Sequence, residues 1–265
     1  MPFIHTFNPT LVTIGPLEIR WYGLAYVVGF ILTFLFIRWN INRKHLDISY
    51  DEMYDWVFYL MLGVLVGSRV FHIIFWDISY YLANPLHMLY FWEGGMSFHG
   101  GFTGVLLGTL FFWKYKIKKR VSLARLLDIL CIPSLFALAL GRIANFINGE
   151  LPGKITDVSW CWYFPGVDGC RHPQVLYSAA KRFLIVGWLV FLMHKNVKRK
   201  HFRDGFIAVN FLTLVGLGRF VVDFFRDDPT FIFLTAGQWL SSAMVIAGVI
   251  ITYRYFMKDL KKIFK

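Results

Sequence analysis

The fold is decided by stretches such as Trp56–Trp76, which reads WVFYLMLGVLVGSRVFHIIFW and holds a single arginine. A helix that crosses the hydrocarbon core of a bilayer needs about 20 mainly apolar residues, and this stretch is long enough. The whole chain is 57% hydrophobic and only 17% charged, whereas soluble domains carry about 25% charged residues. The sequence therefore predicts a protein whose surrounding solvent is lipid.

Comparable apolar stretches follow one another along all 265 residues, with no Gly/Ser linker or low-complexity tract between them. The chain is thus expected to be an all-α integral membrane protein with about seven transmembrane helices in one polytopic domain, residues 1–265. The expected spans are Trp21–Ile37, Trp56–Trp76, Met96–Trp113, Leu126–Ile147, Gln174–Met193, Gly205–Phe225 and Thr235–Tyr253.

Lysine and arginine are concentrated in alternate connections, which predicts the direction of every helix. Cytoplasmic loops carry the excess of basic residues, so the N-terminus is expected outside and the C-terminus in the cytoplasm. The net charge of +12 is then a topology signal, helped by attraction to anionic lipid, and no nucleic-acid partner is expected. The basic segments contain Arg38, Arg43 and Lys44; Lys114, Lys116, Lys118, Lys119, Arg120 and Arg125; Lys195, Lys198, Arg199, Lys200 and Arg203; and Arg254, Lys258, Lys261, Lys262 and Lys265.

Two external segments, residues 77–95 and 148–173, are long enough to fold into a cap over the external side. Turn signals such as Glu93-Gly94-Gly95 and Leu151-Pro152-Gly153 favour lids or interfacial helices there. Cys161 and Cys170 both lie in the second segment, where an oxidising compartment would permit a disulfide. The residues alone leave that pairing open.

Charged residues inside the expected spans gather at the external leaflet once the direction of each helix is assigned. Arg69, Arg142 and Arg219 all fall in the outer halves of their spans. Polar residues at such positions are costly and usually functional. The alternative is snorkelling, in which a long side chain reaches the interface from a turn away; it accounts for Lys181 and is an alternative for Arg69.

Spacing groups some of these residues on common helix faces. Asn145 follows Arg142 by three residues, and Asp223 follows Arg219 by four, so each pair shares one face. An arginine-lined cavity in the outer leaflet suits an anionic head group, since the guanidinium offers two parallel donors to phosphate oxygens.

A further stretch, Phe98-His99-Gly100-Gly101, adds a titratable imidazole beside two glycines. Glycine lets the backbone approach a ligand closely. The competing interpretation is helix packing through small residues at Gly100, Gly104 and Gly108, and the two interpretations are compatible.

Together these motifs resemble the phosphatidylglycerol–prolipoprotein diacylglyceryl transferase family, in the family's order and over most of the chain. The asparagine-rich motif around Arg142 is the most specific. The matching stretches are Trp21-Tyr22-Gly23-Leu24, Gly94-Gly95-Met96-Ser97-Phe98-His99-Gly100-Gly101, Gly141-Arg142-Ile143-Ala144-Asn145-Phe146-Ile147-Asn148-Gly149-Glu150, Arg171-His172-Pro173 and Arg219-Phe220-Val221-Val222-Asp223-Phe224-Phe225-Arg226.

The resemblance implies an enzyme of the bacterial inner membrane that moves a diacylglyceryl group from phosphatidylglycerol to the lipobox cysteine of a prolipoprotein and releases glycerol phosphate. Its site would face the periplasm. The residues carried over from the family motifs are Tyr22, His99, Arg142, Asn145, Glu150, Gly153 and Arg219, with Asp223 at a position where the family usually has Glu.

The chain also departs from the family pattern. Where the family often has Tyr four residues before Arg219, this chain has Val215. After the His-Pro pair the family often reads Gln-Leu-Tyr-Glu with a later Glu-Gly, whereas here Ser178 and Arg182 stand at the two glutamate positions. The fifth span is therefore expected to be remodelled.

Roles follow from the chemistry of displacing a phosphate ester by sulfur. Only the thiolate is a good nucleophile, so His99 is the expected base, and Arg142 and Arg219 would hold the departing phosphate with a hydrogen bond from Asn145. Tyr22 would orient the head group, Gly100 and Gly101 would contact the lipid, Glu150 and Asp223 would position the arginines, and Gly153 would permit a tight loop.

The lipid carries its own leaving group, so no metal, ATP or organic cofactor is expected. Two other classes compete with this reading. An inactive phospholipid-binding relative would need the anionic pocket but not His99 or Tyr22. A transporter would need broken helices near the midplane and paired repeats, and no such repeat is apparent.

Overall fold

The computed structural model describes residues 3–15, 17–90, 94–199 and 202–263. Glu93, Lys200 and Lys265, which were used in the sequence analysis, lie outside these ranges. Within them, six helices are long and apolar enough to cross a membrane, which confirms an all-α integral membrane protein. The six are Trp21–Asn42, Tyr50–Phe75, Leu123–Ile147, Gln174–Val197, Phe206–Phe225 and Ala236–Leu260.

The predicted third span, Met96–Trp113, corresponds to α4 (Phe98–Phe112), which is not among these six. At 15 residues α4 is shorter than the ~20 that cross a bilayer, although a π-helix, Trp113–Ile117, continues it. The polar start at His99 and the lysines in the π-helix limit its apolar length. A count of seven, and the direction of each crossing, therefore stay predictions.

Contact density divides the chain into two compact units, and each is described by itself. Unit 1 contains residues 1–33 and 127–265, and unit 2 contains residues 34–126. Helix α1 (Trp21–Asn42) contributes its first part to unit 1 and its last part to unit 2.

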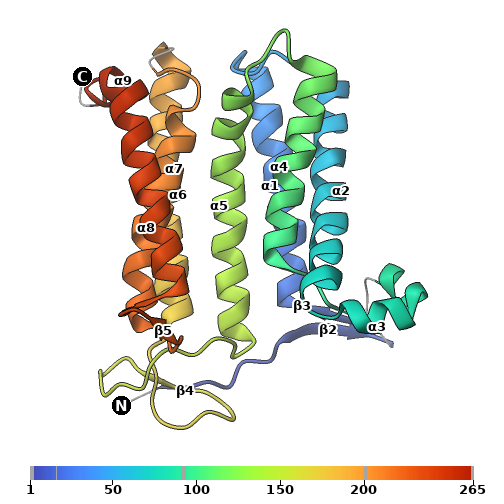
Figure 1. Cartoon of the computed structure of the whole chain (residues 1–265), viewed down its shortest axis with the longest axis vertical. Coiled ribbons are helices and arrows are strands. Elements are labelled where there is room, and N and C mark those ends of the chain that lie inside the picture. Colours follow the sequence, from blue (N-terminus) through green and yellow to red (C-terminus); the bar gives the residue numbers. More distant parts are fainter. Residues whose placement is uncertain (1–2, 16, 91–93, 200–201, 264–265) are drawn as a thin grey trace. The chain divides into compact units, whose positions relative to one another are not determined.

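In unit 2, α2 (Tyr50–Phe75) and α4 lie side by side (Figure 1) and touch backbone to backbone. A Cβ built on Gly67 or Gly100 would collide with the carbonyl oxygen of the other residue, and the same holds for Gly63 and Gly104. Small residues are the means by which membrane helices approach this closely. The packing interpretation of the glycine stripe is thus confirmed for Gly100 and Gly104.

Arg69 of α2 is only 2% exposed and anchors the segment of unit 2 that lies between α2 and α4. This segment contains α3 (Ile78–Ala83) and the 3-10 helix η1 (Pro85–Leu89), so it includes the helical structure that the sequence predicted. The guanidinium also lies 5.0 Å from the ring centroid of Tyr81. Its donors reach the backbone carbonyls of His87, Met88, Tyr90, Gly94 and Gly95. Arg69 is therefore an architectural residue, and neither snorkelling nor ligand binding is needed to explain it.

Unit 1 contains α5 (Leu123–Ile147, from Leu127 onward), α6 (Gln174–Arg199), α7 (Phe206–Val222) and α8 (Ala236–Ile251). Asp128 of α5 is fully buried and accepts hydrogen bonds from the backbone N–H groups of Gly205 at 2.8 Å and Ala208 at 2.7 Å. These donors belong to the start of α7, where N–H groups have no partner within the helix. At the other end of α7 the chain continues through the 3-10 helix Asp223–Phe225.

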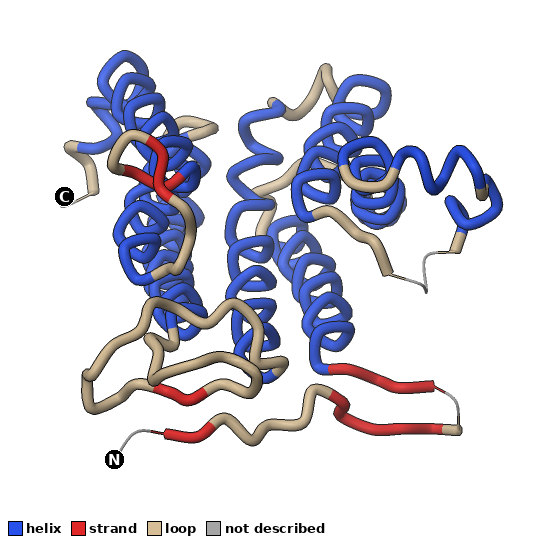
Figure 2. The backbone as a smooth tube through the Cα atoms, turned by 60° about the horizontal axis from the view of Figure 1, so that its bottom comes forward, coloured by secondary structure: helices blue, strands red, loops and turns tan. Residues whose placement is uncertain are grey.

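A π-helix, Thr252–Phe256, and α9 (Met257–Leu260) follow α8. The strands are short, pair in three two-stranded sheets, and lie in the N-terminal arm and the loops, as Figure 2 shows. They are β1 (Phe3–Ile4) with β4 (Trp162–Tyr163), β2 (Thr10–Ile14) with β3 (Leu17–Arg20), and β5 (Thr230–Phe231) with β6 (Leu234–Thr235).

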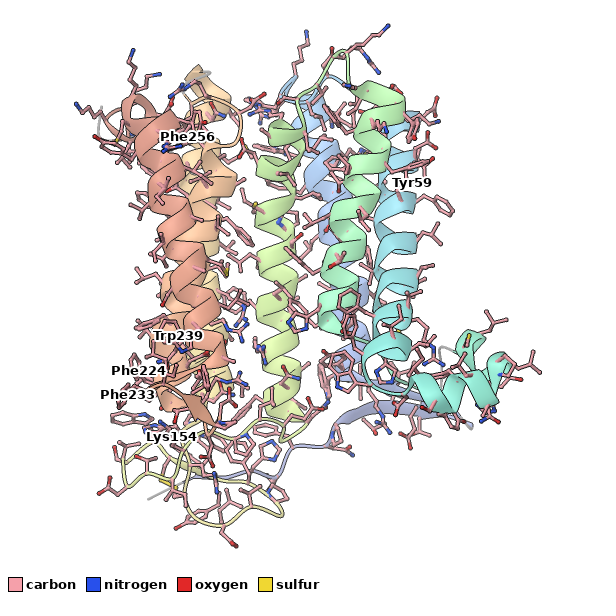
Figure 3. The ribbon with its side chains drawn as sticks, viewed as in Figure 1. Tyr59, Lys154, Phe224, Phe233, Trp239 and Phe256 are labelled. Atoms are coloured by element: carbon pink, nitrogen blue, oxygen red, sulfur yellow. A yellow bond between two sulfur atoms is a disulfide. The ribbon has the colours of Figure 1, made fainter. Side chains whose placement is uncertain are left out.

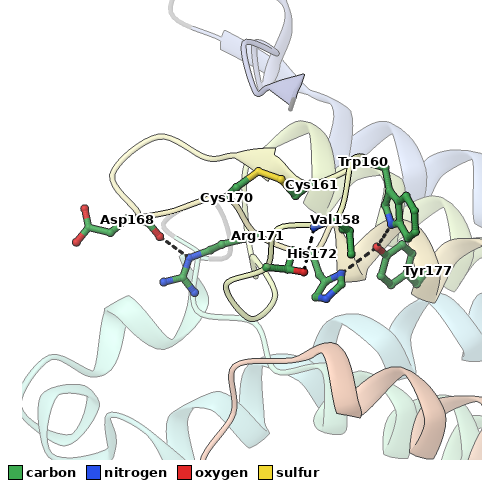
Figure 4. The surroundings of a disulfide bond; sticks show 9 residues. Val158, Trp160, Cys161, Asp168, Cys170, Arg171, His172 and Tyr177 are labelled. Atoms are coloured by element: carbon green, nitrogen blue, oxygen red, sulfur yellow. Dashed lines mark hydrogen bonds between the residues drawn. A yellow bond between two sulfur atoms is a disulfide. The ribbon is translucent and has the colours of Figure 1, made fainter. Parts of the chain in front are cut away.

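In unit 1, residues 148–173 are mostly irregular, so of the two expected forms, a lid-like loop or an interfacial helix, the structure has the loop. A disulfide between Cys161 and Cys170 closes its tip. Figure 4 shows the surrounding contacts, in which Trp160 donates to the hydroxyl of Tyr177 at 2.8 Å and His172 lies 3.2 Å from the same hydroxyl. The β1–β4 pairing ties the N-terminal arm to this segment.

Candidate active site

The C-terminal end of α5 carries a chain of hydrogen bonds that begins at Arg142. Its Nη1 donates to Oδ1 of Asn145 at 3.2 Å, and Nδ2 of Asn145 donates to Oε2 of Glu150 at 2.6 Å. A guanidinium only donates hydrogen bonds and a carboxylate only accepts them. An amide that bonds to both must therefore turn its oxygen toward the arginine and its NH2 group toward the carboxylate. Glu150 therefore positions Asn145, which in turn positions Arg142. The predicted common face of Arg142 and Asn145 is confirmed.

The other N–H groups of the Arg142 guanidinium form no hydrogen bond with the residues that the structure describes. Among those residues, no carboxylate lies within ion-pair distance of the guanidinium. Arg142 is half-buried. A cation in such surroundings is costly unless a partner compensates its charge. The geometry therefore favours an anion supplied from outside the chain.

The end of α7 carries a second arginine, whose counter-ion lies within the chain. Nε of Arg219 is 3.6 Å from Oδ2 of Asp223, and the carboxylate of Asp223 is 3% exposed. Thr235 donates its hydroxyl to the same carboxylate at 3.5 Å. The predicted i,i+4 pairing of Arg219 with Asp223 is confirmed, and the half-exposed guanidinium is held at the helix end.

Gly237, at the start of α8, is a neighbour of this pair that sequence reasoning missed. A Cβ there would collide with Oδ2 of Asp223 and would meet Nη2 of Arg219 at 3.0 Å. Only a residue without a side chain leaves the ion pair in place. The residue carries no motif of its own, so its role became visible only when α7 and α8 were packed together.

Gly153 holds the loop that follows α5 against the end of α7. Its N–H donates to the carbonyl of His172 at 3.0 Å, and its own carbonyl accepts from Arg171 at 3.1 Å. A Cβ would lie 2.5 Å from the carbonyl oxygen of Phe225 and 2.7 Å from that of His172. The expectation of a tight loop at Gly153 is thus confirmed in its geometry.

A cleft of about 410 Å³ opens between these loops. Arg226 lines it and is compensated by Asp228, through contacts of 2.7 and 3.3 Å. Arg171 also lines it and pairs with Asp227 at 2.9 Å. The two aspartates line the cleft as well, and the other lining residues are Leu151, Pro152, Val167 and Gln174.

The charges from these separate elements interact with one another. Arg142 lies within electrostatic range of Arg219, Arg226, Asp223 and the phenol of Tyr22, all of them in unit 1. Tyr22 opens α1 and is 37% exposed. Electrostatic interactions therefore link Arg142 with three other predicted site residues, Tyr22, Arg219 and Asp223.

Two basic residues of α6 interact with the same group, although the sequence analysis assigned them no role in the site. Lys181 and Arg182 each interact electrostatically with Arg142, Arg219 and Asp223. The carbon stem of Lys181 packs against Gly218 of α7, with Cδ 3.0 Å from a Cβ built there. Lys181 thus lies within electrostatic range of this cluster, and its snorkelling stays a prediction.

Exposed aromatic side chains mark the level of this end of unit 1. Figure 3 shows Phe224, Phe233 and Trp239 at the same end as Lys154, and Phe256 at the opposite end of α7 and α8. Phe233 is 95% exposed and Phe224 is 52% exposed. Such belts occur where a membrane meets water, so the Arg219–Asp223 pair lies close to an interface.

His99, Gly100 and Gly101 belong to unit 2. His99 is exposed in the first turn of α4, whose N-cap Ser97 accepts from the N–H of Gly100. A Cβ built on Gly100 would collide with the backbone of α2. A Cβ built on Gly101 would have Cβ of Ser68 as its nearest neighbour, at 3.7 Å. Their contact with a lipid, and the role of His99 beside the arginines, stay predictions.

Comparison with known proteins identifies the family. A family model described as prolipoprotein diacylglyceryl transferase matches residues 9–254. A phosphatidylglycerol–prolipoprotein diacylglyceryl transferase of Geobacter sulfurreducens is 40% identical over 255 residues, which are 94% of this chain and 95% of that protein. The protein of the same name from Bordetella parapertussis is 41% identical over 91% of this chain and 92% of its own length. The chain therefore belongs to the prolipoprotein diacylglyceryl transferase family.

Proposed function

We propose that this protein transfers the diacylglyceryl group of phosphatidylglycerol to the lipobox cysteine of a prolipoprotein and releases glycerol phosphate, the first step of lipoprotein maturation. The observation that carries the proposal is Arg142, a half-buried guanidinium with no carboxylate partner in the described chain, grouped with Arg219 and Tyr22. Family membership supplies the reaction to which this anion site is suited.

The chemistry assigns the arginines to the leaving group. The cysteine sulfur attacks the carbon of the diacylated glycerol that bears the phosphate, and a C–S bond forms there. The bond between that carbon and the phosphate oxygen breaks, with its electron pair on oxygen. The thiol proton passes to a base, and the phosphate oxygens gain negative charge as the ester leaves. Preorganised donors aimed at that developing charge lower the barrier, and the fork of Arg142, aligned by Asn145 and Glu150, is such a donor.

The other roles are extensions of the same proposal. His99 takes the thiol proton, since an imidazole titrates near neutral pH, and Tyr22 orients the head group beside Arg142. Gly100 and Gly101 contact the lipid. Gly153 keeps the loop close to the site, where its N–H and carbonyl are both engaged.

The site is proposed to face the periplasm from the outer leaflet of the bacterial inner membrane, where a secreted cysteine and a phospholipid head group meet. Support comes from the basic connections, which favour an N-out, C-in topology. The exposed aromatic side chains Phe224, Phe233 and Trp239 lie at the end of unit 1 that carries Arg219 and Asp223.

The test uses the purified full chain, phosphatidylglycerol vesicles and a peptide that contains a lipobox cysteine. Glycerol phosphate should be released in step with lipidation of the peptide, and a peptide with serine in place of that cysteine should give neither. A folded protein that binds phosphatidylglycerol but releases no glycerol phosphate would be a lipid-binding relative instead, and the transferase proposal would be wrong.

A further inference from the structure

We infer that His5, in the N-terminal arm, is a positioning residue that holds the end of α5 and thereby aligns the hydrogen bonds that run from Arg142 through Asn145 to Glu150. The inference rests on the proposed function for the role of Arg142, and it deepens that function by adding a residue far away in the sequence. His5 is 6% exposed, although its neighbours in the arm are exposed. A polar side chain buried in this way needs a hydrogen-bond partner.

Helix α5 ends in a Schellman motif, in which the chain turns back on the last helical turn. The N–H of Glu150 donates to the carbonyl of Asn145 at 2.9 Å, and the N–H of Gly149 donates to the carbonyl of Phe146 at 3.0 Å. Gly149 has a φ of 70°, the left-handed conformation that this motif needs just past the helix. The turn brings Glu150 back to Asn145, and the side chains of these two residues form the hydrogen bond of 2.6 Å.

His5 contacts this turn at two points. Its Nε2 lies 2.6 Å from the carbonyl oxygen of Phe146, and because a carbonyl only accepts, Nε2 carries the hydrogen. The imidazole also packs on Gly149, since the three atoms nearest to a Cβ built there all belong to the His5 ring, at 3.4 to 3.9 Å. One side chain thus bonds to a carbonyl inside the turn and covers the glycine that makes the turn.

The backbone of the arm around His5 is itself fixed, because it pairs with β4. The N–H of His5 donates to the carbonyl of Tyr163 at 3.0 Å, and the N–H of Phe3 donates to the carbonyl of Cys161 at 3.0 Å. The disulfide joins Cys161 to Cys170. A residue positions another accurately only when its own place is fixed, and His5 meets this condition.

The effect on the site follows from the order of these contacts. Phe146 is next to Asn145 and Gly149 is next to Glu150, so a shift of the turn moves both side chains of the 2.6 Å hydrogen bond. Asn145 in turn aligns the guanidinium of Arg142. A misplacement of about 1 Å at a catalytic group lowers a rate by up to about 100-fold. Loosening the turn therefore lowers kcat although His5 touches no substrate.

Two substitutions in the full chain test the hydrogen bond of His5. His5→Leu removes the donor, whereas His5→Gln restores one, because the amide nitrogen of glutamine reaches about as far as Nε2 of histidine. With phosphatidylglycerol vesicles and the lipobox peptide, His5→Leu should lower kcat by about tenfold or more and leave the KM for the peptide unchanged. His5→Gln should keep kcat within about threefold of the wild type. A normal kcat in His5→Leu, or equal losses in both variants, would overturn the inference.

Phe3→Leu is the matched control in the same arm. Phe3 is half-exposed and stacks on Trp162 of β4, with ring centroids 5.0 Å apart. This variant should keep a normal kcat, and a loss as large as that of His5→Leu would assign the effect to the arm as a whole and contradict the role of His5. If His5→Leu melts below the assay temperature, His5→Asn replaces it, since its amide is one methylene too short to reach the carbonyl of Phe146.

Hydrogen exchange separates this inference from the proposed function, because it needs no turnover. The N–H groups of Gly149 and Glu150 are bonded within the turn, so they should exchange about tenfold faster in His5→Leu and at the normal rate in His5→Gln. Unchanged exchange in His5→Leu would refute the role of His5. If the exchange rates change as expected but the wild type releases no glycerol phosphate, the proposed function alone is wrong.

Discussion

Two buried or half-buried arginines, Arg69 in unit 2 and Arg142 in unit 1, have opposite surroundings. Arg69 is 2% exposed, and its donors point at backbone carbonyls between His87 and Gly95. Arg142 has one side-chain acceptor among the described residues, Asn145, and no carboxylate within ion-pair distance, although it interacts electrostatically with Asp223 and Tyr22 as well as with two further arginines. An arginine whose donors are used by its own chain builds the fold, whereas one with donors left over is available for a ligand.

The largest effect that this comparison predicts is on catalysis. Arg142→Ala should lower glycerol phosphate release by on the order of 100- to 1000-fold, the usual cost of removing a donor to developing charge. Arg142→Lys should recover little, because one ammonium does not replace a two-pronged fork. The melting temperature should hardly change. Near-normal release by Arg142→Ala would remove this residue from the mechanism.

Arg69→Ala should act on stability instead. The substitution leaves several carbonyls of partly buried residues without a donor, and a fully buried group left so costs about 1–3 kcal/mol. We expect destabilisation on the order of 3 kcal/mol or more, measured by thermal unfolding in detergent, together with faster proteolysis of the segment 77–95. If Arg69→Ala melts like the wild type, the architectural role is wrong.

Helix packing offers a matched pair of glycine substitutions next to this segment. Gly104→Ala should destabilise unit 2 by about 1–3 kcal/mol, because the added methyl would collide with the backbone of Gly63. Gly101→Ala is the control for stability, since its nearest neighbour would be 3.7 Å away. The measurement is the melting temperature of each variant in detergent, which should be lower for Gly104→Ala than for Gly101→Ala. Equal melting temperatures would contradict the close contact of α2 and α4.

The smallest expected effect is a pH dependence in the loop segment of unit 1, residues 148–173. Burial lowers the pKa of His172 below its ordinary value, since desolvation disfavours the charged form. The unfolded segment therefore binds the proton more readily, and stability is lost as pH falls through about 6.5. Proteolysis of residues 148–173 should be faster at pH 5.5 than at pH 7.5. His172→Gln should remove that difference, and a protection that is independent of pH in the wild type would contradict this reading.

Much of the site could be predicted because its first contacts are local. Arg142 with Asn145, and Arg219 with Asp223, are three and four residues apart on a helix, so periodicity alone places them on one face. The roles of Gly237 and Arg226, and the inclusion of Lys181, could not be read this way. The partners of Gly237 and Lys181 lie on other helices, and no sequence spacing encodes those distances; Arg226 pairs with Asp228 only two residues away, but no spacing rule marks that pair.

The amino-acid sequence by itself determined that the chain lies in a membrane, where most of its helices run, and which family its motifs resemble. These properties depend on apolar length, charge distribution and short-range spacing, which are properties of a linear chain. Only the tertiary structure decided which charges are compensated. It assigned Arg69 to backbone carbonyls, confirmed the pairing of Arg219 with Asp223 that helix spacing had predicted, and left Arg142, Lys181 and Arg182 without a carboxylate in the described chain. The reason is physical: compensation falls off with distance in space, and these distances are set by helix packing.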